Sequence, residues 1–236
     1  MSVEESVSKT ASLSAALLGP TAEADAVAVE RALAEFRAGR PVVIHRRDEA
    51  LVACSVELAD EVMLGRIEAA AAGKAHLVLP AARLRRLGVE RTVPGVVALP
   101  KLDAQRIVTL ALDIEAKIDA PVGPAQALDI SALELAALGL VLPPVIAMPL
   151  PLAEVAGQGL VMVEARAVDT YRTEQVRMLK IVGRAPVPLE GAPESEFVVF
   201  RGGEGHRDQV AILVGKPDFA RPVPVRLHSA CLTGDL

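Results

Sequence analysis

The sequence predicts an α/β (mixed α+β) fold built from two successive domains. Apolar runs of strand length alternate with segments of helical periodicity over most of the chain. Hydrophobic residues make up 52% of the 236 positions and charged residues 23%, which excludes an intrinsically disordered chain. Prolines and glycines cluster between residues 186 and 193, and only strand-like runs follow them. We therefore expect a helix-and-strand domain at 21–187, preceded by a flexible tail at 1–20 and followed by the first strands of a second domain at 188–236.

The first domain opens with a helix, because Val29, Leu33 and Phe36 recur at helical spacing and Gly39 is suited to end it. Short apolar runs then predict strands, and segments that end at a glycine predict helices. The expected strands are 42–44, 51–54 and 76–79, and the expected helices are 58–72 and 81–87.

The middle of the chain gives three further expectations. The apolar run 107–114 contains several β-branched residues, which predicts a buried strand. Ser131 and Glu134 have the spacing of a capping box, which predicts a short helix from there to residue 138. Asp169 is expected to cap a helix that runs to residue 182. The remaining expected strands are 145–148, 160–163, 197–200, 210–214 and 223–227.

Composition and charge limit the classes of partner and the cellular compartment that we expect for this protein. The net charge is −5 and aromatic residues make up only 2%, so a nucleic acid is not an expected partner. The uncharged stretch 135–153 contains four prolines, which would break a lipid-exposed helix, so we interpret it as buried core and expect no membrane association. Two cysteines form no disulfide framework and the N-terminus lacks the pattern of a signal peptide, so we expect a cytoplasmic protein.

The most informative segment is residues 226–235, RLHSACLTGD, which crowds polar side chains directly after an expected strand. Arg226 is suited to pair with phosphate oxygens, and Cys231 is a candidate zinc ligand because zinc favours thiolate sulfur. Two alternatives stay open on chemistry alone. One is a polar turn with a single buried cysteine, and the other is a metal pair formed by His228 and Cys231.

Residues 226–235 closely resemble the pattern R-[VIL]-H-S-x-C-x-T-G-D of GTP cyclohydrolase II, the hydrolase that opens riboflavin biosynthesis. The resemblance implies that Arg226, Leu227, His228, Ser229 and Ala230 contact GTP. It also implies that Cys231 is the first of three zinc ligands, with magnesium as a further metal of the complete protein. The C-x-C pair that supplies the other two ligands, the catalytic acid and the arginine nucleophile would lie beyond Leu236. We therefore expect no catalytic residue within this chain, and no turnover by the chain alone.

The front of the chain more weakly resembles 3,4-dihydroxy-2-butanone 4-phosphate synthase, at residues 38–44 (AGRPVVI) and 75–88 (AHLVLPAARLRRLG). That family holds magnesium with an acidic loop of the type D-D-E-x-R-E-N-E-G-D. The corresponding place here reads HRRDEALVA, where only Asp48 and Glu49 remain. The resemblance therefore implies a degenerate synthase-like domain. Asp48 and Glu49 follow two arginines, so we expect them to form a solvated turn, with a relic metal site as the alternative. The resemblance also implies a homodimer.

Other conspicuous residues have ordinary structural interpretations. The arginines Arg83, Arg85 and Arg86 are a candidate phosphate patch but are more typical of the charged face of a short helix. His76 is expected to be a hydrogen-bonded histidine of the core or of a sheet edge, and Cys54 a small buried residue. The alternative function is a non-catalytic module that binds a nucleotide or a partner enzyme through the synthase-like domain.

Overall fold

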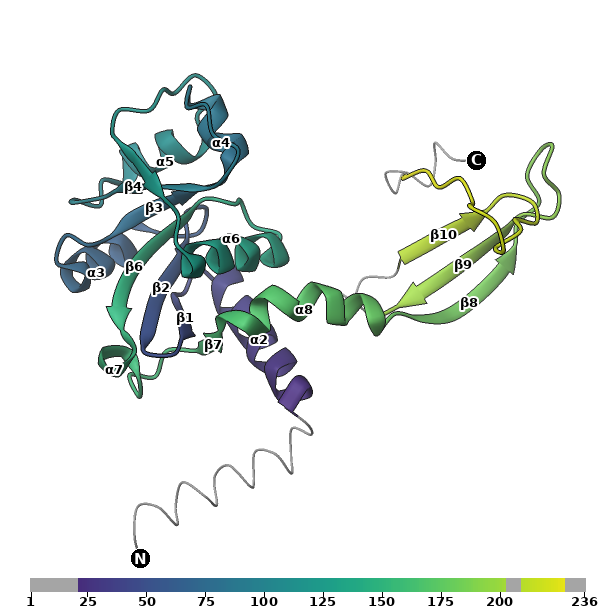
Figure 1. Ribbon diagram of the computed structural model, residues 1–236, viewed down its shortest axis with the longest axis horizontal. Helices are drawn as coiled ribbons and strands as arrows, with labels where there is room; N and C mark the ends of the chain where they lie inside the picture. The colour runs from purple at the N-terminus through teal and green to yellow at the C-terminus, as the bar shows by residue number, and fades with distance from the viewer. Residues whose placement is uncertain (1–20, 203–208, 228–236) are drawn as a thin grey trace, which may run out of the picture. The chain divides into compact units, whose positions relative to one another are not determined.

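The structure, a computed structural model, describes residues 21–202 and 209–227 and divides the chain into two compact units, 1–173 and 174–236 (Figure 1). The expected tail at 1–20 lies outside the described residues. The domain ranges 21–187 and 188–236 stay a prediction. The mixed α/β fold is confirmed, since both helices and strands build the first unit.

The first unit is built on one seven-stranded sheet with the strand order β5-β4-β3-β6-β2-β1-β7. Neighbouring strands are antiparallel, except that β7 runs parallel to β1. The strands are β1 Val42–Arg46, β2 Glu49–Ser55, β3 His76–Leu79, β4 Gly95–Ala98, β5 Val122–Pro124, β6 Val145–Pro151 and β7 Met162–Glu164. The central position of β6 explains its apolar composition, because both of its faces are covered.

Helices cover both faces of this sheet and create two buried clusters. On one face, α2 (Thr21–Arg37), α6 (Ala127–Gly139) and the start of α8 (Ala165–Arg177) pack on alternate strand residues such as Ile44 and Ala147. The opposite face is covered by α3 (Glu61–Ala71), α4 (Ala81–Arg86), α5 (Ala104–Leu112) and α7 (Leu152–Val155). Successive strand residues alternate between the two clusters, as the two-residue period of a strand requires.

The expected strand at 107–114 is wrong, because residues 107–112 belong to the helix α5. Asp103 caps the helix by accepting a hydrogen bond from the backbone N–H of Arg106 at 2.9 Å. Ile107, Leu110 and Ala111 are buried, so the core-facing residues follow a helical period and not an alternating one.

Two further helix bounds differ from expectation. Helix α6 begins at Ala127, where the carboxylate of Asp129 accepts the N–H of Gln126 at 2.7 Å, so Ser131 lies inside the helix instead of capping it. Helix α8 ends at Arg177, and Asp169 also lies inside its helix. The residues after Leu179, expected to be helical, form a strand because they pair with the next strand of the second unit.

The second unit contains a three-stranded antiparallel sheet in the order β10-β9-β8. Its strands are β8 Lys180–Pro186, β9 Glu196–Arg201 and β10 Gln209–Leu213. Pairing register places Phe197, Val199, Val210 and Ile212 on one face of this sheet. Val210 and Ile212 are 56% and 41% exposed, so this face is poorly covered by the described residues. The strand expected at 223–227 is wrong, since these residues have no regular structure and Leu227 is 94% exposed.

Candidate functional site

The residues expected to bind GTP and zinc lie at the very end of the described part of the second unit. Arg226 and Leu227 are both exposed and follow β10 without forming a further strand. The other four candidates, His228, Ser229, Ala230 and Cys231, lie outside the described residues. The structure therefore leaves the grouping of these six side chains a prediction.

The second unit also contains a cavity of about 430 Å³ that the sequence did not predict. Its charged lining is arranged in pairs: Arg184 contacts Glu196 at 2.7 Å and Lys216 contacts Glu194 at 2.6 Å. The hydroxyl of the buried Ser195 donates to the carbonyl of Ala192 and accepts the N–H of Gly215. These contacts satisfy the polar groups of the cavity internally, which makes it a structural feature of the loops that join the strands.

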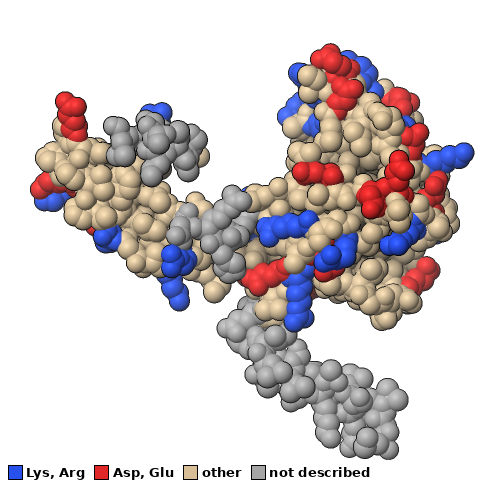
Figure 2. Space-filling model, turned by 180° about the vertical axis from the view of Figure 1, so that it is seen from behind, with Lys and Arg blue, Asp and Glu red and all other residues tan. Residues whose placement is uncertain are grey.

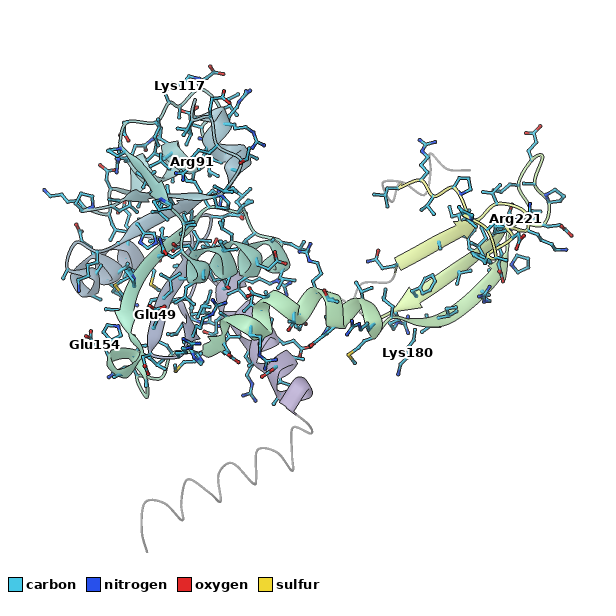
Figure 3. The ribbon with its side chains drawn as sticks, viewed as in Figure 1. Glu49, Arg91, Lys117, Glu154, Lys180 and Arg221 are labelled. Carbon is cyan, nitrogen blue, oxygen red and sulfur yellow. The ribbon has the colours of Figure 1, made fainter. Side chains whose placement is uncertain are left out.

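In the first unit, the place expected for an acidic loop is a tight turn between β1 and β2. The turn consists of Arg47, whose φ is 53°, and Asp48, and it closes the pairing of Arg46 with Glu49. All four side chains are exposed, as expected for a solvated turn. Beside this turn lies a cavity of about 660 Å³, lined by residues of β1, β2, β6 and α6 and by Lys74 and His76 (Glu49 is labelled in Figure 3).

His76 is satisfied by hydrogen bonding, as the sequence predicted, and its partner is Asp129 at the start of α6. The Nε2 atom of His76 lies 2.7 Å from Oδ1 of Asp129, whose exposed side-chain fraction is 4%. The second oxygen of Asp129 accepts the N–H of Gln126. One buried carboxylate therefore joins β3 to the first turn of α6 and positions that turn at the cavity.

The arginines of α4 and the thiol of Cys54 have structural roles. Arg83 donates to the carbonyl oxygens of Thr109, Leu110 and Asp113, so it closes the C-terminal end of α5 instead of facing a ligand. Cys54 is fully buried, and burial raises the pKa of its thiol to about 11. A buried thiol with this pKa is a poor nucleophile at neutral pH.

Within residues 21–202 and 209–227, no three His, Cys, Asp or Glu side chains gather closely enough to hold a metal ion. None of the helices in that part of the chain has the length and apolar character needed to cross a bilayer. Acidic and basic side chains are interspersed over the face of the larger unit that Figure 2 shows. Neither zinc nor magnesium ligation is therefore assigned to the described residues.

Comparison with known proteins identifies relatives of both units. Residues 180–236 match the family GTP cyclohydrolase II. The GTP cyclohydrolase-2 of Xylella fastidiosa strain 9a5c is 38% identical over 217 residues, which cover 88% of this chain and 53% of that protein. The GTP cyclohydrolase-2 of Azospirillum brasilense is 36% identical over 235 residues, covering 92% of this chain and 61% of that protein. The chain thus spans about half the length of the curated relatives it matches.

Solved structures with a similar fold are 3,4-dihydroxy-2-butanone 4-phosphate synthases. The two-domain synthase RibBX from A. baumannii has a TM-score of 0.51 at 16% identity, covering 79% of this chain and 70% of that one. A cation-free synthase structure has a TM-score of 0.51 at 13% identity, covering 63% of this chain and 98% of that one. At these identities the likeness concerns the fold alone. The resemblance to GTP cyclohydrolase II is confirmed for the segment that contains the terminal motif. Over most of its length the chain is similar in sequence to GTP cyclohydrolase-2 proteins.

Proposed function

We propose that this chain is the front part of a GTP cyclohydrolase II that hydrolyses GTP, with release of formate and pyrophosphate, for riboflavin biosynthesis. The observation that supports it most is the family match over residues 180–236, which contains the whole motif from Arg226 to Asp235. The two GTP cyclohydrolase-2 relatives described above extend the similarity into the first unit.

In this proposal the motif binds the nucleotide. Arg226 has an exposed guanidinium, which is the side chain best suited to a bidentate contact with phosphate oxygens. The backbone and side chains of Leu227, His228, Ser229 and Ala230 complete the contact with GTP. The sequence-based expectations of a homodimer and of a cytoplasmic location belong to this proposal as well.

The zinc ion of the family would be held here by Cys231 together with two ligands from outside this chain. Zinc sites that catalyse hydrolysis have three protein ligands, and this sequence supplies one of them in the motif. The residues of this chain do not make a complete site, so we assign them nucleotide binding and a single metal contact, and no catalytic step.

A chimeric protein tests the proposal. Residues 1–236 are joined to the part of the Xylella fastidiosa relative that follows its aligned region, and formate release from GTP and bound zinc are measured together. We expect formate release and about one zinc per chain, because the appended part would complete the ligand set.

The matched cysteine variants make this test decisive. Cys231→Ser should lose both zinc and formate release, whereas Cys54→Ala should keep both because Cys54 is buried in the first unit. Circular dichroism confirms that each variant is folded. Zinc and turnover that persist in a folded Cys231→Ser chimera would overturn the assignment of Cys231.

A further inference from the structure

A groove of about 530 Å³ lies between α3 and α7, on the face of the first unit's sheet that these helices cover (both are labelled in Figure 1). Val52 of β2 and Met148 of β6 line it from the sheet, and Ile67 of α3 and Val155 of α7 line it from the helices. These four side chains are each 4–6% exposed, whereas Cys54 of β2 is fully buried. The groove therefore leaves part of the buried cluster accessible to solvent, and its volume is that of an ordinary small-molecule site.

The lining of this space, which we call the α3–α7 groove, is mostly apolar. Two of its side chains are the methionines Met63 and Met148, whose flexible thioether chains adapt to ligands of different shape. An apolar surface of this kind favours a ligand whose apolar part displaces water from it. The other lining residues are apolar or glycine, with four polar exceptions: Glu35, Arg40, Arg66 and Gln158.

Arg66 is the one positively charged side chain of the α3–α7 groove without a recorded carboxylate partner among the described residues. Arg40 donates to both carboxylate oxygens of Glu35, one of them at 2.8 Å, so these two charges neutralise each other. The helix α3 offers no carboxylate at the positions three and four residues from Arg66, which are the positions that face it. Those residues are Val62, Met63, Ala69 and Ala70.

One uncompensated guanidinium beside apolar walls selects a particular kind of anion. A guanidinium stays protonated and binds a carboxylate through two parallel hydrogen bonds. A phosphate monoester carries a charge of about −1.5 to −2 at neutral pH, which is more than a single arginine compensates. The charge of the groove therefore fits a monocarboxylate better than a phosphate ester.

We propose that the α3–α7 groove binds a small molecule that has an apolar chain or ring system and one carboxylate, and that the guanidinium of Arg66 holds this carboxylate. The apolar part of the ligand contacts Met63, Ile67 and Met148. The proposal concerns the first unit alone and does not depend on the proposed cyclohydrolase function.

Binding of four probes to the 236-residue chain tests the chemistry of the ligand. The probes are decanoate, 1-decanol, decyl phosphate and acetate, titrated in a calorimeter below the concentrations at which they form micelles. We expect decanoate to saturate one site per chain and 1-decanol to bind about tenfold more weakly, because it lacks the charge-assisted contact. Acetate should show no saturable binding, since it lacks the apolar chain.

Methyl resonances of the methionines test the place of binding. Decanoate should shift the methyl signals of Met63 and Met148, which line the groove. The signal of Met178, an exposed methionine of the second unit, should stay unchanged and serves as the internal control.

Two matched pairs of variants separate the charge of the groove from its space. Arg66→Ala should weaken decanoate about tenfold and leave 1-decanol within about twofold, whereas Arg86→Ala, at an exposed arginine outside the lining, should change neither. Ala70→Trp fills the groove and should abolish binding of both probes. Ala69→Trp is its control, because Ala69 is exposed on the same helix but does not line the groove.

Each of four results would overturn the proposal. The first is the absence of saturable decanoate binding, and the second is binding of 1-decanol or decyl phosphate at least as tight as that of decanoate. The third is an equal effect of Arg66→Ala and Arg86→Ala on decanoate. The fourth is decanoate binding that persists in Ala70→Trp or leaves the methyl signals of Met63 and Met148 unshifted.

Discussion

The two units of this chain differ in how they bury their sheets. The first unit covers both faces of a seven-stranded sheet with helices and buries large side chains such as Phe36, Ile44 and Leu135 completely. Among the described residues of the second unit, Val198 is the one buried apolar side chain, and Val210, Ile212 and Phe219 are exposed. The unit that carries the cyclohydrolase motif thus gains far less from burial than the unit that lacks it.

This contrast predicts which substitutions change the stability of the protein and which change its function. A three-stranded sheet needs a covered apolar face to be stable by itself, whereas the first unit has two such faces. We therefore expect substitutions in the first unit to determine the stability of the described structure. Substitutions near the terminal motif should change function with little effect on that stability.

The largest expected effect comes from a pair of phenylalanines, one in each unit. Phe36→Ala removes a fully buried side chain and should lower the free energy of unfolding by about 3–5 kcal/mol. Phe219→Ala removes a side chain that is 72% exposed and should change it by at most about 0.5 kcal/mol. Urea unfolding followed by circular dichroism measures the free energy of unfolding of both variants. Equal losses in Phe36→Ala and Phe219→Ala would contradict the contrast between the units.

Asp129→Ala tests the buried hydrogen bonds that join β3 to α6 in the first unit. The change leaves Nε2 of His76 and the N–H of Gln126 without their acceptor, so the free energy of unfolding should fall by about 2–3 kcal/mol. Asp119→Ala is the control, because Asp119 forms an exposed pair with Arg106 that is worth at most about 1 kcal/mol. Urea unfolding measures both variants. A smaller loss of unfolding free energy in Asp129→Ala than in Asp119→Ala would refute the role of Asp129 in joining β3 to α6.

Arg83→Ala tests whether the basic face of α4 is structural. Arg83 donates to three carbonyl oxygens at the end of α5, so its loss should cost about 1–2 kcal/mol of unfolding free energy. Arg86 lies on the same helix, is exposed, and forms no recorded hydrogen bond or ion pair with the described residues. Arg86→Ala should therefore change thermal stability little, and a larger loss of stability in Arg86→Ala than in Arg83→Ala would contradict the structural role of Arg83.

The buried thiol of Cys54 predicts a dependence of stability on alkaline pH. Burial raises the pKa of its thiol to about 11, above the value of about 8.5 for an unfolded cysteine. The folded state therefore favours the protonated thiol, and this contribution is fully present below pH 8.5 and is lost as the pH rises toward 11. Thermal unfolding between pH 8 and pH 11 should show a smaller decline in Cys54→Ala than in the parent chain.

The sequence predicted some parts of this molecule much better than others. The terminal motif identified the family from ten residues because it combines fixed residue types at fixed spacing. The strand at 107–114 was mispredicted because β-branched composition outweighed the helical spacing of Ile107, Leu110 and Ala111. The capping residue of α6 was missed because Gln126 is an uncommon cap, and Ser131 offered a more familiar pattern.

The cavity of the first unit illustrates what a single sequence does not determine. Its lining comes from strand ends up to about a hundred positions apart, and only the crossover order of the sheet brings them together. His76 was expected to find a partner, but Asp129 lies 53 positions away and no local pattern joins the two. Local capping and periodicity are visible in a sequence, whereas strand order depends on the competition between many possible pairings.

The central claim, that Arg226 binds GTP for hydrolysis, is tested most directly by formate release from the chimera described above. Arg226→Ala should lower the rate about 10- to 100-fold, as expected for the loss of one charge-assisted contact to phosphate. Arg221→Ala, an exposed arginine of the same unit that pairs with Asp218 at 3.5 Å, should leave the rate within about twofold (Figure 3). Equal rates in the parent chimera and in Arg226→Ala would contradict the proposal.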